Sequence, residues 1–321
     1  MGYGEMKKYI GVDIGGTKCS VVLADEEMKI LKKEKFPTEA LNCTIEKIIS
    51  IVADFAKGGD IIAAGISCGG PLDEKNGIIL SPPNLPGWDS VCITDAVSSA
   101  ANATAYLKND ADACAFAEWK FGAGKGAANM IFLTFGTGMG AGLILNGRLY
   151  RGACGMAGEV GHIRLEKDGP VGYGKAGSFE GFCSGGGIKR TAEAIIREKL
   201  SRGECVPYCR TADEINLLDA KFLCEQARKG DKTALEILEK CGEKLGYALS
   251  MLIDILNPEK IVIGSIYARS GDLLEHSMRR TLEAEALGES LDACEILPAS
   301  LGDDIGDYAA LCTAKFAEEM K

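Results

Sequence analysis

Short apolar runs that end in glycine-rich turns dominate the first part of the chain. Residues 9–14 have the pattern of a buried strand, two glycines then predict a tight turn, and residues 18–23 predict a second strand. Between 44 and 55 the apolar residues recur at helical spacing, and residues 61–67 return to a strand pattern. This alternation of strands and helices predicts an α/β fold.

A proline-rich run at 69–88 comes before the next strand and helix. It is unsuited to a helix or a central strand, so we expect a loop on the surface or along a cleft. A strand at 104–108 then leads into a helix. Asn109 and Asp110 are therefore expected where this strand ends and the helix begins.

The strand–turn–strand pattern occurs a second time. Residues 10–17, I-G-V-D-I-G-G-T, align with residues 131–138, I-F-L-T-F-G-T-G, so that Asp13 stands opposite Thr134. A duplication of this kind, with one copy in each domain, would set two glycine-rich turns face to face across a cleft.

The rest of the chain is mostly helical, after a hairpin turn that Asn146-Gly147 predicts. Because 321 residues are about twice the length of one typical domain, two domains are expected: 1–118, with a closing helix at 303–321 packed on it, and 119–302. The further expected elements are helices at 188–200, 220–228, 231–256 and 272–287 and a strand at 260–264.

Charge and cysteine content exclude several classes of protein. Lys and Arg total 36 against 46 Asp and Glu, a net charge of −10, and no basic run suits a nucleic-acid backbone. No run of 18 apolar residues occurs, the start at 1–8 is short and polar, and the 13 cysteines are scattered. We expect a cytoplasmic protein with reduced thiols and without nucleic-acid or membrane partners.

Both glycine-rich turns could lay consecutive backbone N–H groups against phosphate oxygens. The first is no P-loop, because Thr17 separates the last glycine from Lys18, and the second lacks the last glycine and the helix of the dinucleotide fingerprint. Two ordinary hairpin turns are the alternative. The occurrence of two such turns in register favours phosphate binding.

Two acidic positions at strand ends suit phosphoryl transfer. Asp13 is the kind of carboxylate that holds Mg²⁺ through water near a triphosphate. Asn109-Asp110 has two interpretations: an N-cap of the following helix, or, for Asp110, a general base for a hydroxyl nucleophile.

Glu159, His162 and Glu180 lie in a glycine-rich stretch that holds one of only two histidines. Carboxylates with an imidazole suit a neutral polyol, because each can bond to neighbouring hydroxyls. A metal site is the competing interpretation, but His162 has no recognisable zinc spacing with Cys154 or Cys183.

Taken together, these motifs resemble the ROK family, named for repressors, open reading frames and kinases, within the sugar kinase and actin-like ATPase superfamily. The resemblance covers nearly the whole chain in family order. It rests on D-I-G-G-T-K (13–18), G-G-P-L-D (69–73), P-N-L-P-G-W (83–88), N-D-A-D-A (109–113), E-W-K-F-G-A-G (118–124), T-F-G-T-G-M-G-A-G (134–142), E-V-G-H (159–162) and N-P-E-K-I-V-I-G (257–264).

The resemblance implies two actin-like (ribonuclease-H-like) ATPase lobes flanking a central cleft, in a homodimer or homotetramer. It implies transfer of phosphate from ATP, with Mg²⁺, to a hexose, with Asp110 as catalytic base. The implied sugar contacts are Gly70, Asn84, Asn109, Asp110, Glu159, His162 and Glu180. The implied nucleotide contacts are Asp13, Gly15, Gly16, Thr17, Lys18, Thr134, Gly136, Thr137, Gly138 and Gly264.

The sequence departs from the family pattern at three places. The zinc loop of the family usually reads C-x-C-G-x-x-G-C-x-E, whereas residues 171–180 contain no cysteine. We therefore expect no structural zinc and hypothesise that packing of Tyr173 and Phe179 replaces it. Residues 265–267 replace the glycines that often follow Gly264, on the adenine side. The helix-turn-helix of the regulators is not expected, because the first strand begins early.

Within the family we expect phosphorylation of glucose at its 6-hydroxyl, an entry to glycolysis. Another family substrate is the first alternative: N-acetylmannosamine, N-acetylglucosamine, fructose, mannose or allose. A catalytically silent sugar sensor is the second.

Overall fold

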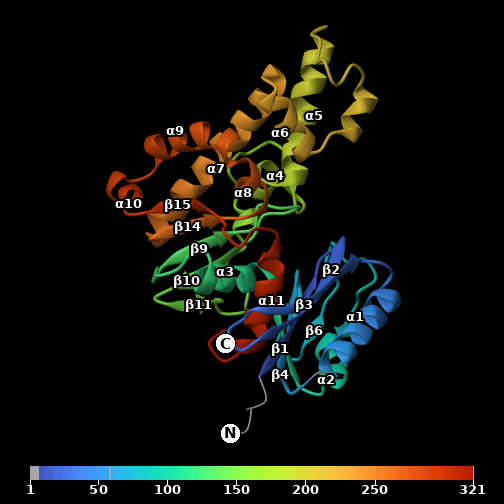
Figure 1. Ribbon diagram of the computed structural model, residues 1–321. Helices are drawn as coiled ribbons and strands as arrows, with labels where there is room; N and C mark the ends of the chain where they lie inside the picture. The colour runs from blue at the N-terminus through green and yellow to red at the C-terminus, as the bar shows by residue number, and fades with distance from the viewer. Residues whose placement is uncertain (1–6, 58, 321) are drawn as a thin grey trace. The chain divides into compact units, whose positions relative to one another are not determined.

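The computed structural model describes residues 7–57 and 59–320, so most of the short polar start lies outside the described residues. The chain divides into two compact units (Figure 1). Unit 1 comprises Met1–Lys125, Gly147–Leu149 and Asp303–Lys321, and unit 2 comprises Gly126–Asn146 and Tyr150–Gly302. The two ends of the chain therefore belong to the same unit.

Unit 1 is built on a five-stranded sheet in the order β3-β2-β1-β4-β8. Strand β1 pairs antiparallel with β2 and parallel with β4, as the turn between the first two strands and the helix before the fourth require. The strands are β1 (Lys8–Ile14), β2 (Lys18–Asp25), β3 (Ile30–Pro37), β4 (Ile61–Cys68) and β8 (Thr104–Asn109).

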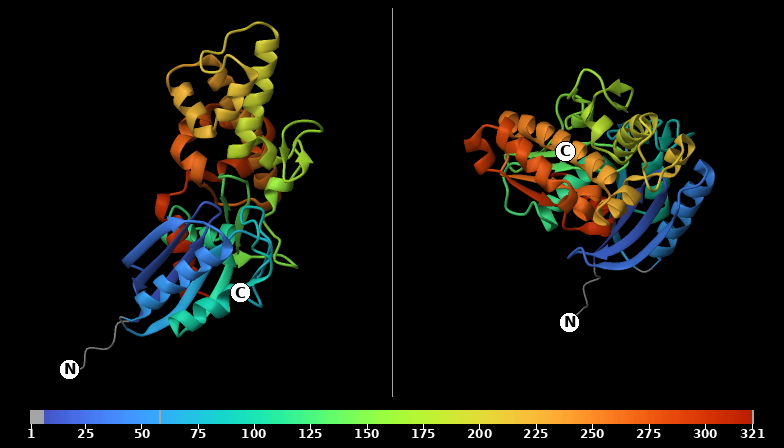
Figure 2. Two further views of the ribbon diagram at one scale, coloured as in Figure 1. Left: turned by 90° about the vertical axis from the view of Figure 1, so that its right-hand side faces the viewer. Right: turned by 90° about the horizontal axis from the view of Figure 1, so that it is seen from above.

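Helices cover both faces of this sheet. On one face, α1 (Leu41–Ala56) and α2 (Ile93–Ala101) lie side by side, and the apolar positions of α1 at helical spacing, among them Ile48 and Val52, are buried (Figure 2). The sequence prediction for α1 is confirmed within a few residues.

On the other face lie α3 (Asp110–Phe121) and the closing helix α11 (Ile305–Lys315), which contacts β1 and β4. Glycines let the helix approach this closely: a Cβ added to Gly65 would lie 2.1 Å from the carbonyl oxygen of Ala310. The proline-rich run forms a loop with the two-residue strands β5 (Leu72–Asp73), β6 (Ile78–Ile79) and β7 (Val91–Cys92), as its composition predicted.

A second sheet repeats the same plan; its strands lie in unit 2, except that Arg148 and Leu149 of its edge strand are counted with unit 1. Its order is β11-β10-β9-β14-β15, with β9 antiparallel to β10 and parallel to β14. The duplicated strand–turn–strand pattern is thus confirmed at the level of topology. The strands are β9 (Met130–Leu133), β10 (Ala141–Leu145), β11 (Arg148–Tyr150), β14 (Lys260–Ile263) and β15 (Glu295–Pro298).

The hairpin between β10 and β11 also follows the prediction, because Asn146 and Gly147 have φ values of 53° and 70°. The helices of unit 2 are α4 (Phe179–Phe182), α5 (Gly185–Ser201), α6 (Ala220–Arg228), α7 (Lys232–Leu256), α8 (Ser265–Ser270), α9 (Glu275–Glu285) and α10 (Gly288–Asp292). The remaining elements are the hairpin β12 (Val171–Gly172) and β13 (Lys175–Ala176), and the 3₁₀ turns η1 (Val160–His162), η2 (Ala212–Leu217), η3 (Gly271–Leu273) and η4 (Gly302–Asp304).

The core of unit 2 forms where α7 packs against α5, α6 and α9. The helix expected at 272–287 is divided into η3 and α9, which the sequence pattern did not indicate. Over residues 7–57 and 59–320, no helix combines the length and the apolar character that crossing a membrane requires.

Candidate functional site

A row of polar residues crosses the unit 1 sheet on the face that α11 covers. The strands are in register at Lys35, Ser20, Asp13, Ser67 and Lys108, and residues that stand opposite one another in a sheet project to the same face. Asp13 is at the centre of this row, next to the first glycine-rich turn.

The first glycine-rich turn is closed by its own backbone. The N–H of Gly15 donates to the carbonyl oxygen of Lys18 over 3.1 Å, and Thr38 bonds both to the carbonyl oxygen of Gly15 and, through its N–H, to that of Thr17. Gly16 and Thr17 are exposed at its tip. These hydrogen bonds therefore fix the turn, while the backbone at its tip stays accessible to solvent.

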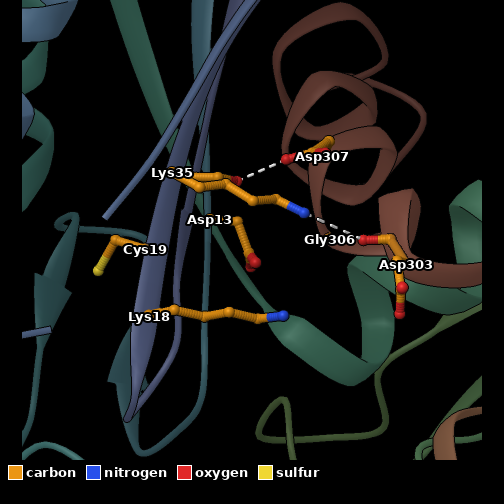
Figure 3. A pocket seen from close by; sticks show the side chains of 8 residues that line it. Asp13, Lys18, Cys19, Lys35, Asp303, Gly306 and Asp307 are labelled. Carbon is orange, nitrogen blue, oxygen red and sulfur yellow. Dashed lines mark hydrogen bonds between the residues drawn. The ribbon is translucent and has the colours of Figure 1, made fainter. Parts of the chain in front are cut away.

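A small pocket lies beside Asp13 (Figure 3). In Figure 3 the side chains of Lys18 and Lys35 extend from the strands toward α11, with the carboxylate of Asp13 between them. The full lining is Asp13, Lys18, Cys19, Ser20, Lys35, Asp303, Gly306 and Asp307.

The environment of Asp13 disfavours its charged form. Burial, followed by the negative charges of Asp110 and Asp307, raises the pKa of the Asp13 carboxyl to about 7, although Lys18 and Lys35 act in the opposite direction. A bound cation would stabilise the charged form of this carboxyl, because it would offset the repulsion from Asp110 and Asp307 that favours the protonated form.

Two residues of α11 that the sequence did not single out complete the pocket. Ser20 donates a hydrogen bond of 2.5 Å to Oδ1 of Asp307, and Lys33 forms an ion pair with the other carboxylate oxygen. A Cβ on Gly306 would lie 2.3 Å from Oδ2 of Asp13, so any larger residue there would displace this carboxylate. No local signal predicts these contacts, since 287 positions separate Ser20 from Asp307.

Asn109 and Asp110 lie at the junction of β8 and α3, as expected. Asn109 is the N-cap of α3: its side chain accepts hydrogen bonds from the N–H groups of Ala111 and Asp112 over 3.0 and 3.3 Å. The cap interpretation is therefore confirmed for Asn109. Asp110 is the next residue, and its Oδ1 accepts from the same Ala111 N–H over 2.8 Å.

The Asp110 side chain is accessible to solvent. Desolvation by the surrounding protein atoms nevertheless raises the pKa of its carboxyl, and the backbone hydrogen bond from Ala111 partly offsets this shift. Gly70 lies beside Asn109, because a Cβ there would be 3.5 Å from the side-chain amide nitrogen of Asn109. Gly70, Asn109 and Asp110 are thus neighbours in unit 1. Asn84 packs against Gly16: a Cβ added to Gly16 would lie 2.6 Å from the carbonyl oxygen of Asn84.

The second glycine-rich turn, in unit 2, is closed by Thr134. The side chain of Thr134 accepts from the N–H of Gly140 over 2.9 Å, and its own N–H donates to the carbonyl oxygen of Gly140 over 3.0 Å. Phe135 is fully buried at a φ of 22°, which is unfavourable for a bulky residue. Thr137 is exposed at the tip of the turn.

The elements around this turn approach it closely. The N–H of Gly185, at the start of α5, donates to the carbonyl oxygen of Gly136 over 2.8 Å. The N–H of Gly264 donates a hydrogen bond of 2.8 Å to the carbonyl oxygen of Leu133, the last residue of β9. Ser265 follows with a φ of 50°, and a Cβ on Gly136 would lie 3.5 Å from its hydroxyl. The start of α5 is a neighbour that the sequence prediction missed.

Glu180 and the η1 segment also pack against the turn. Oε2 of Glu180 accepts a hydrogen bond of 3.1 Å from the N–H of Met139, and a Cβ on Gly138 would lie 2.7 Å from the same oxygen. Within η1, a Cβ on Gly161 would lie 2.1 Å from the carbonyl oxygen of Met139. Glu159 and His162, on either side of η1, have exposed side chains.

The loop between η1 and α4 is organised by its own polar groups. Arg164 donates to the carbonyl oxygens of Lys167 and Ala176 over 3.2 and 2.9 Å, and Lys175 donates to that of His162 over 2.7 Å. An ion pair between Glu166 and Lys244 attaches the loop to α7.

Tyr173 and Phe179, the two aromatic residues expected to pack in place of zinc, differ in burial. Phe179 is fully buried, but Tyr173 is 70% exposed at the tip of the β12–β13 hairpin and meets only the edge of the His162 ring, at a centroid distance of 6.3 Å. Because a residue so exposed contributes little packing, the role assigned to Tyr173 is wrong.

The described residues include no cluster of three or more His, Cys, Asp or Glu side chains arranged to hold a metal ion. The expected lack of zinc stays a prediction. Mg²⁺ that binds together with a nucleotide needs few ligands from the protein, because it keeps several water ligands. Asp13 fits that role: burial and two neighbouring negative charges raise the pKa of its carboxyl despite Lys18 and Lys35, and the nearby Ser67 hydroxyl is buried without a hydrogen-bond partner among the described residues.

Comparison with known proteins now decides the family. The model of the ROK family matches residues 9–315. The chain belongs to the ROK family. A ROK family glucokinase from Streptomyces griseus, solved in complex with glucose and AMPPNP, is 31% identical, with a TM-score of 0.78 over 98% of this chain and 100% of that chain. ROK kinases have the actin-like ATPase fold, which explains the two sheets with the same plan.

Two further relatives match most of this chain. The glucokinase of Thermotoga maritima is 33% identical over 96% of this chain and 97% of its own. The xylose repressor of Caldicellulosiruptor bescii is 28% identical over 85% of this chain and 69% of its own. The relatives of this chain thus include both a kinase and a repressor.

Proposed function

We propose that this protein is an ATP-dependent glucokinase, which transfers the terminal phosphate of ATP to the 6-hydroxyl of glucose. The observation that carries the proposal is the similarity to glucokinases at 33% and 31% identity over at least 96% of the chain. The local geometry supports it, because a carboxyl with a raised pKa stands at the start of α3 in the unit that also holds the first phosphate turn.

Asp110 is proposed as the general base. A raised pKa makes the carboxylate a stronger base, so it accepts the proton of a sugar hydroxyl more readily as that hydroxyl attacks phosphorus. The hydrogen bond from the Ala111 N–H fixes the carboxylate at the helix start. Asn109, bound to the first turn of α3, would hold the neighbouring hydroxyl in place.

The nucleotide would be held by the two glycine-rich turns, 13–18 and 134–138. Their backbone N–H groups and Lys18 compensate phosphate charge without side-chain obstruction. Mg²⁺, when bound with ATP, neutralises charge on the phosphates and on Asp13. The backbone bonds of Gly15 and Thr134 keep both turns in shape before ATP arrives.

The sugar contacts are proposed for both units. Unit 1 would contribute Gly70, Asn84, Asn109 and Asp110, and unit 2 would contribute Glu159, His162 and Glu180. Carboxylates, an amide and an imidazole can each bond to hydroxyls of a neutral sugar.

A coupled spectrophotometric assay tests the proposal. Purified protein with Mg-ATP is offered glucose, mannose, fructose, allose, N-acetylglucosamine and N-acetylmannosamine at equal concentrations. Glucose should give the highest kcat/KM, and the product should be glucose 6-phosphate. A higher kcat/KM for another sugar would replace glucose as the substrate, and no ATP consumption with any sugar would reject the kinase.

A sugar-responsive regulator is the second candidate, because the xylose repressor matches 85% of this chain. Such a protein would bind a sugar, and xylose in particular, without consuming ATP. Isothermal titration with xylose and with glucose, run beside the kinase assay, distinguishes the two functions.

The proposal extends to the state of the protein in the cell. From the family resemblance we expect a homodimer or homotetramer in the cytoplasm. Light scattering after size-exclusion chromatography measures the assembly, and a mass near the 34.0 kDa of one chain would contradict it.

A further inference from the structure

The peptide group of Met139 lies between the two elements that carry the proposed sugar residues of unit 2. Its N–H is held by the carboxylate of Glu180 over 3.1 Å. Its carbonyl oxygen touches the backbone of η1, since a Cβ on Gly161 would lie only 2.1 Å away. Met139 itself is 5% exposed and belongs to the second glycine-rich turn.

The same corner of α4 and α5 holds the turn at a second point. The hydroxyl of Ser184 donates to the carbonyl oxygen of Glu180 over 2.7 Å, and the next residue, Gly185, donates its N–H to the carbonyl oxygen of Gly136 over 2.8 Å. The turn at 134–140 is therefore attached on both sides to the segment that carries Glu180. A shift of Glu180 cannot leave the turn unchanged.

The turn can respond to such a shift. It contains glycine at 136, 138 and 140, and it begins at Phe135, whose φ of 22° is an unfavourable conformation for this residue. Glu180 has a second carboxylate oxygen, for which the described part of the chain supplies no hydrogen bond. A hydroxyl that binds this oxygen would fix the carboxylate and, through it, the Met139 N–H.

We propose that Glu180 is a positioning residue that couples the two substrates: sugar bound to Glu180 orders the turn at 134–140 through Met139, and the ordered turn binds the phosphates of ATP more tightly. This inference rests on the proposed function, in which Glu180 contacts sugar and the turn contacts ATP. Coupling of this kind is reciprocal, so ATP must tighten sugar binding by the same factor.

The energetic cause is preorganisation. A turn whose N–H groups are already fixed loses less conformational freedom when phosphate binds, so the affinity rises without a new contact to the nucleotide. Glucose should therefore increase the affinity for Mg-AMPPNP at least about fivefold, the lower end of the usual range for coupled sites.

Two alanine substitutions in the same turn separate the coupling from simple damage. Gly138→Ala places a Cβ 2.7 Å from Oε2 of Glu180 and so displaces the carboxylate, whereas Gly136→Ala has its nearest neighbour at 3.5 Å, the Ser265 hydroxyl. Both add one methyl group to the turn. Any direct loss of AMPPNP affinity cancels, because the coupling factor is a ratio measured with and without sugar.

Isothermal titration of Mg-AMPPNP with and without saturating glucose gives the coupling factor for the wild type and both variants. We expect about fivefold or more for the wild type and Gly136→Ala, and a value near one for Gly138→Ala. A wild-type factor of one, or equal factors for the two variants, overturns the coupling. If turnover with glucose is normal in the same preparation, the proposed function still stands.

Hydrogen exchange decides the question if Gly138→Ala fails to fold. Glucose alone, without nucleotide, should slow exchange of the Met139 amide in the wild type, while unchanged exchange overturns the inference. Failure to phosphorylate any hexose rejects the proposed function and this inference with it.

Discussion

At the scale of single residues, two carboxyls in unit 1 have raised pKa values for different reasons. The pKa of Asp13 is raised to about 7 by burial and by neighbouring negative charges. The pKa of the solvent-accessible Asp110 carboxyl is raised by desolvation from the surrounding protein atoms, and a backbone hydrogen bond partly opposes this shift. The environment of Asp13 suits a carboxyl that binds a cation, and the environment of Asp110 suits a general base.

Replacement of Asp110 by asparagine should lower kcat at least about 100-fold, because the amide cannot accept the sugar proton. Asparagine keeps the acceptor for the Ala111 N–H, so the fold and sugar affinity should change little. Steady-state kinetics and titration with glucose measure the two quantities. Near-normal turnover would remove the base role.

The pKa of Asp13 predicts a dependence of ATP binding on pH. Below a pH of about 7 the Asp13 carboxyl takes up a proton, so the KM for Mg-ATP should rise as the pH falls from 8 to 6. The groups that act on it are Asp110, Asp307, Lys18 and Lys35. A KM profile without this rise would contradict the assignment of Asp13 to the Mg-ATP site.

The same shift has a consequence for stability. The folded protein holds the Asp13 proton up to a pH of about 7 and the unfolded chain loses it near 3.8, so stability falls between these values. At pH 8, Asp13→Asn should therefore be more stable than the wild type by on the order of 2 kcal/mol and unfold at a higher temperature. Near pH 4, the two proteins should unfold at similar temperatures. Thermal unfolding at both pH values measures this, and a destabilised variant at pH 8 would contradict the raised pKa.

At the scale of elements, the start of α11 is fitted to the end of β1. Asp307 joins β2 and β3 to the helix through Ser20 and Lys33, and Gly306 leaves room for the Asp13 carboxylate. The closing helix thus shapes the pocket beside the first glycine-rich turn as well as covering the sheet.

Gly306→Ala should therefore lower kcat/KM for ATP at least about tenfold, even though alanine favours helix formation over glycine by up to about 1 kcal/mol. The added Cβ would lie 2.3 Å from Oδ2 of Asp13 and displace it. Gly288→Ala, at a helical position with open space around it, is the matched control and should be neutral. Equal kinetics for the two variants would show that Asp13 tolerates the shift.

Hydrogen bonds and an ion pair order the loop between η1 and α4. Arg164 closes it from inside, and Glu166 attaches it to α7. Zinc has no evident ligand set there, since residues 171–180 contain no cysteine.

At the scale of the whole molecule, we expect zinc to be absent from the purified protein. Elemental analysis should find far less than one zinc per chain, and incubation with EDTA should leave the unfolding temperature and the sugar affinity unchanged. Stoichiometric zinc would contradict this prediction and would require ligands outside the 171–180 loop.

The two sheets share one plan: five strands, of which the first in sequence pairs antiparallel with the second and parallel with a later one. Each unit uses the turn of its hairpin as a candidate phosphate site. The units differ in what surrounds that turn, which is a helix from the far end of the chain in unit 1 and the Glu180 segment in unit 2.

The sequence alone determined the elements, the repeated strand–turn–strand unit and the position of Asn109 and Asp110, because these follow from local periodicity and from turn and cap preferences. Only the tertiary structure decided that Asp307 bonds to Ser20, that Gly306 touches Asp13 and that Glu180 holds Met139. It also corrected the role of Tyr173. These are contacts between residues distant in the chain, and the pKa of Asp13 depends on them, so no local pattern contains them.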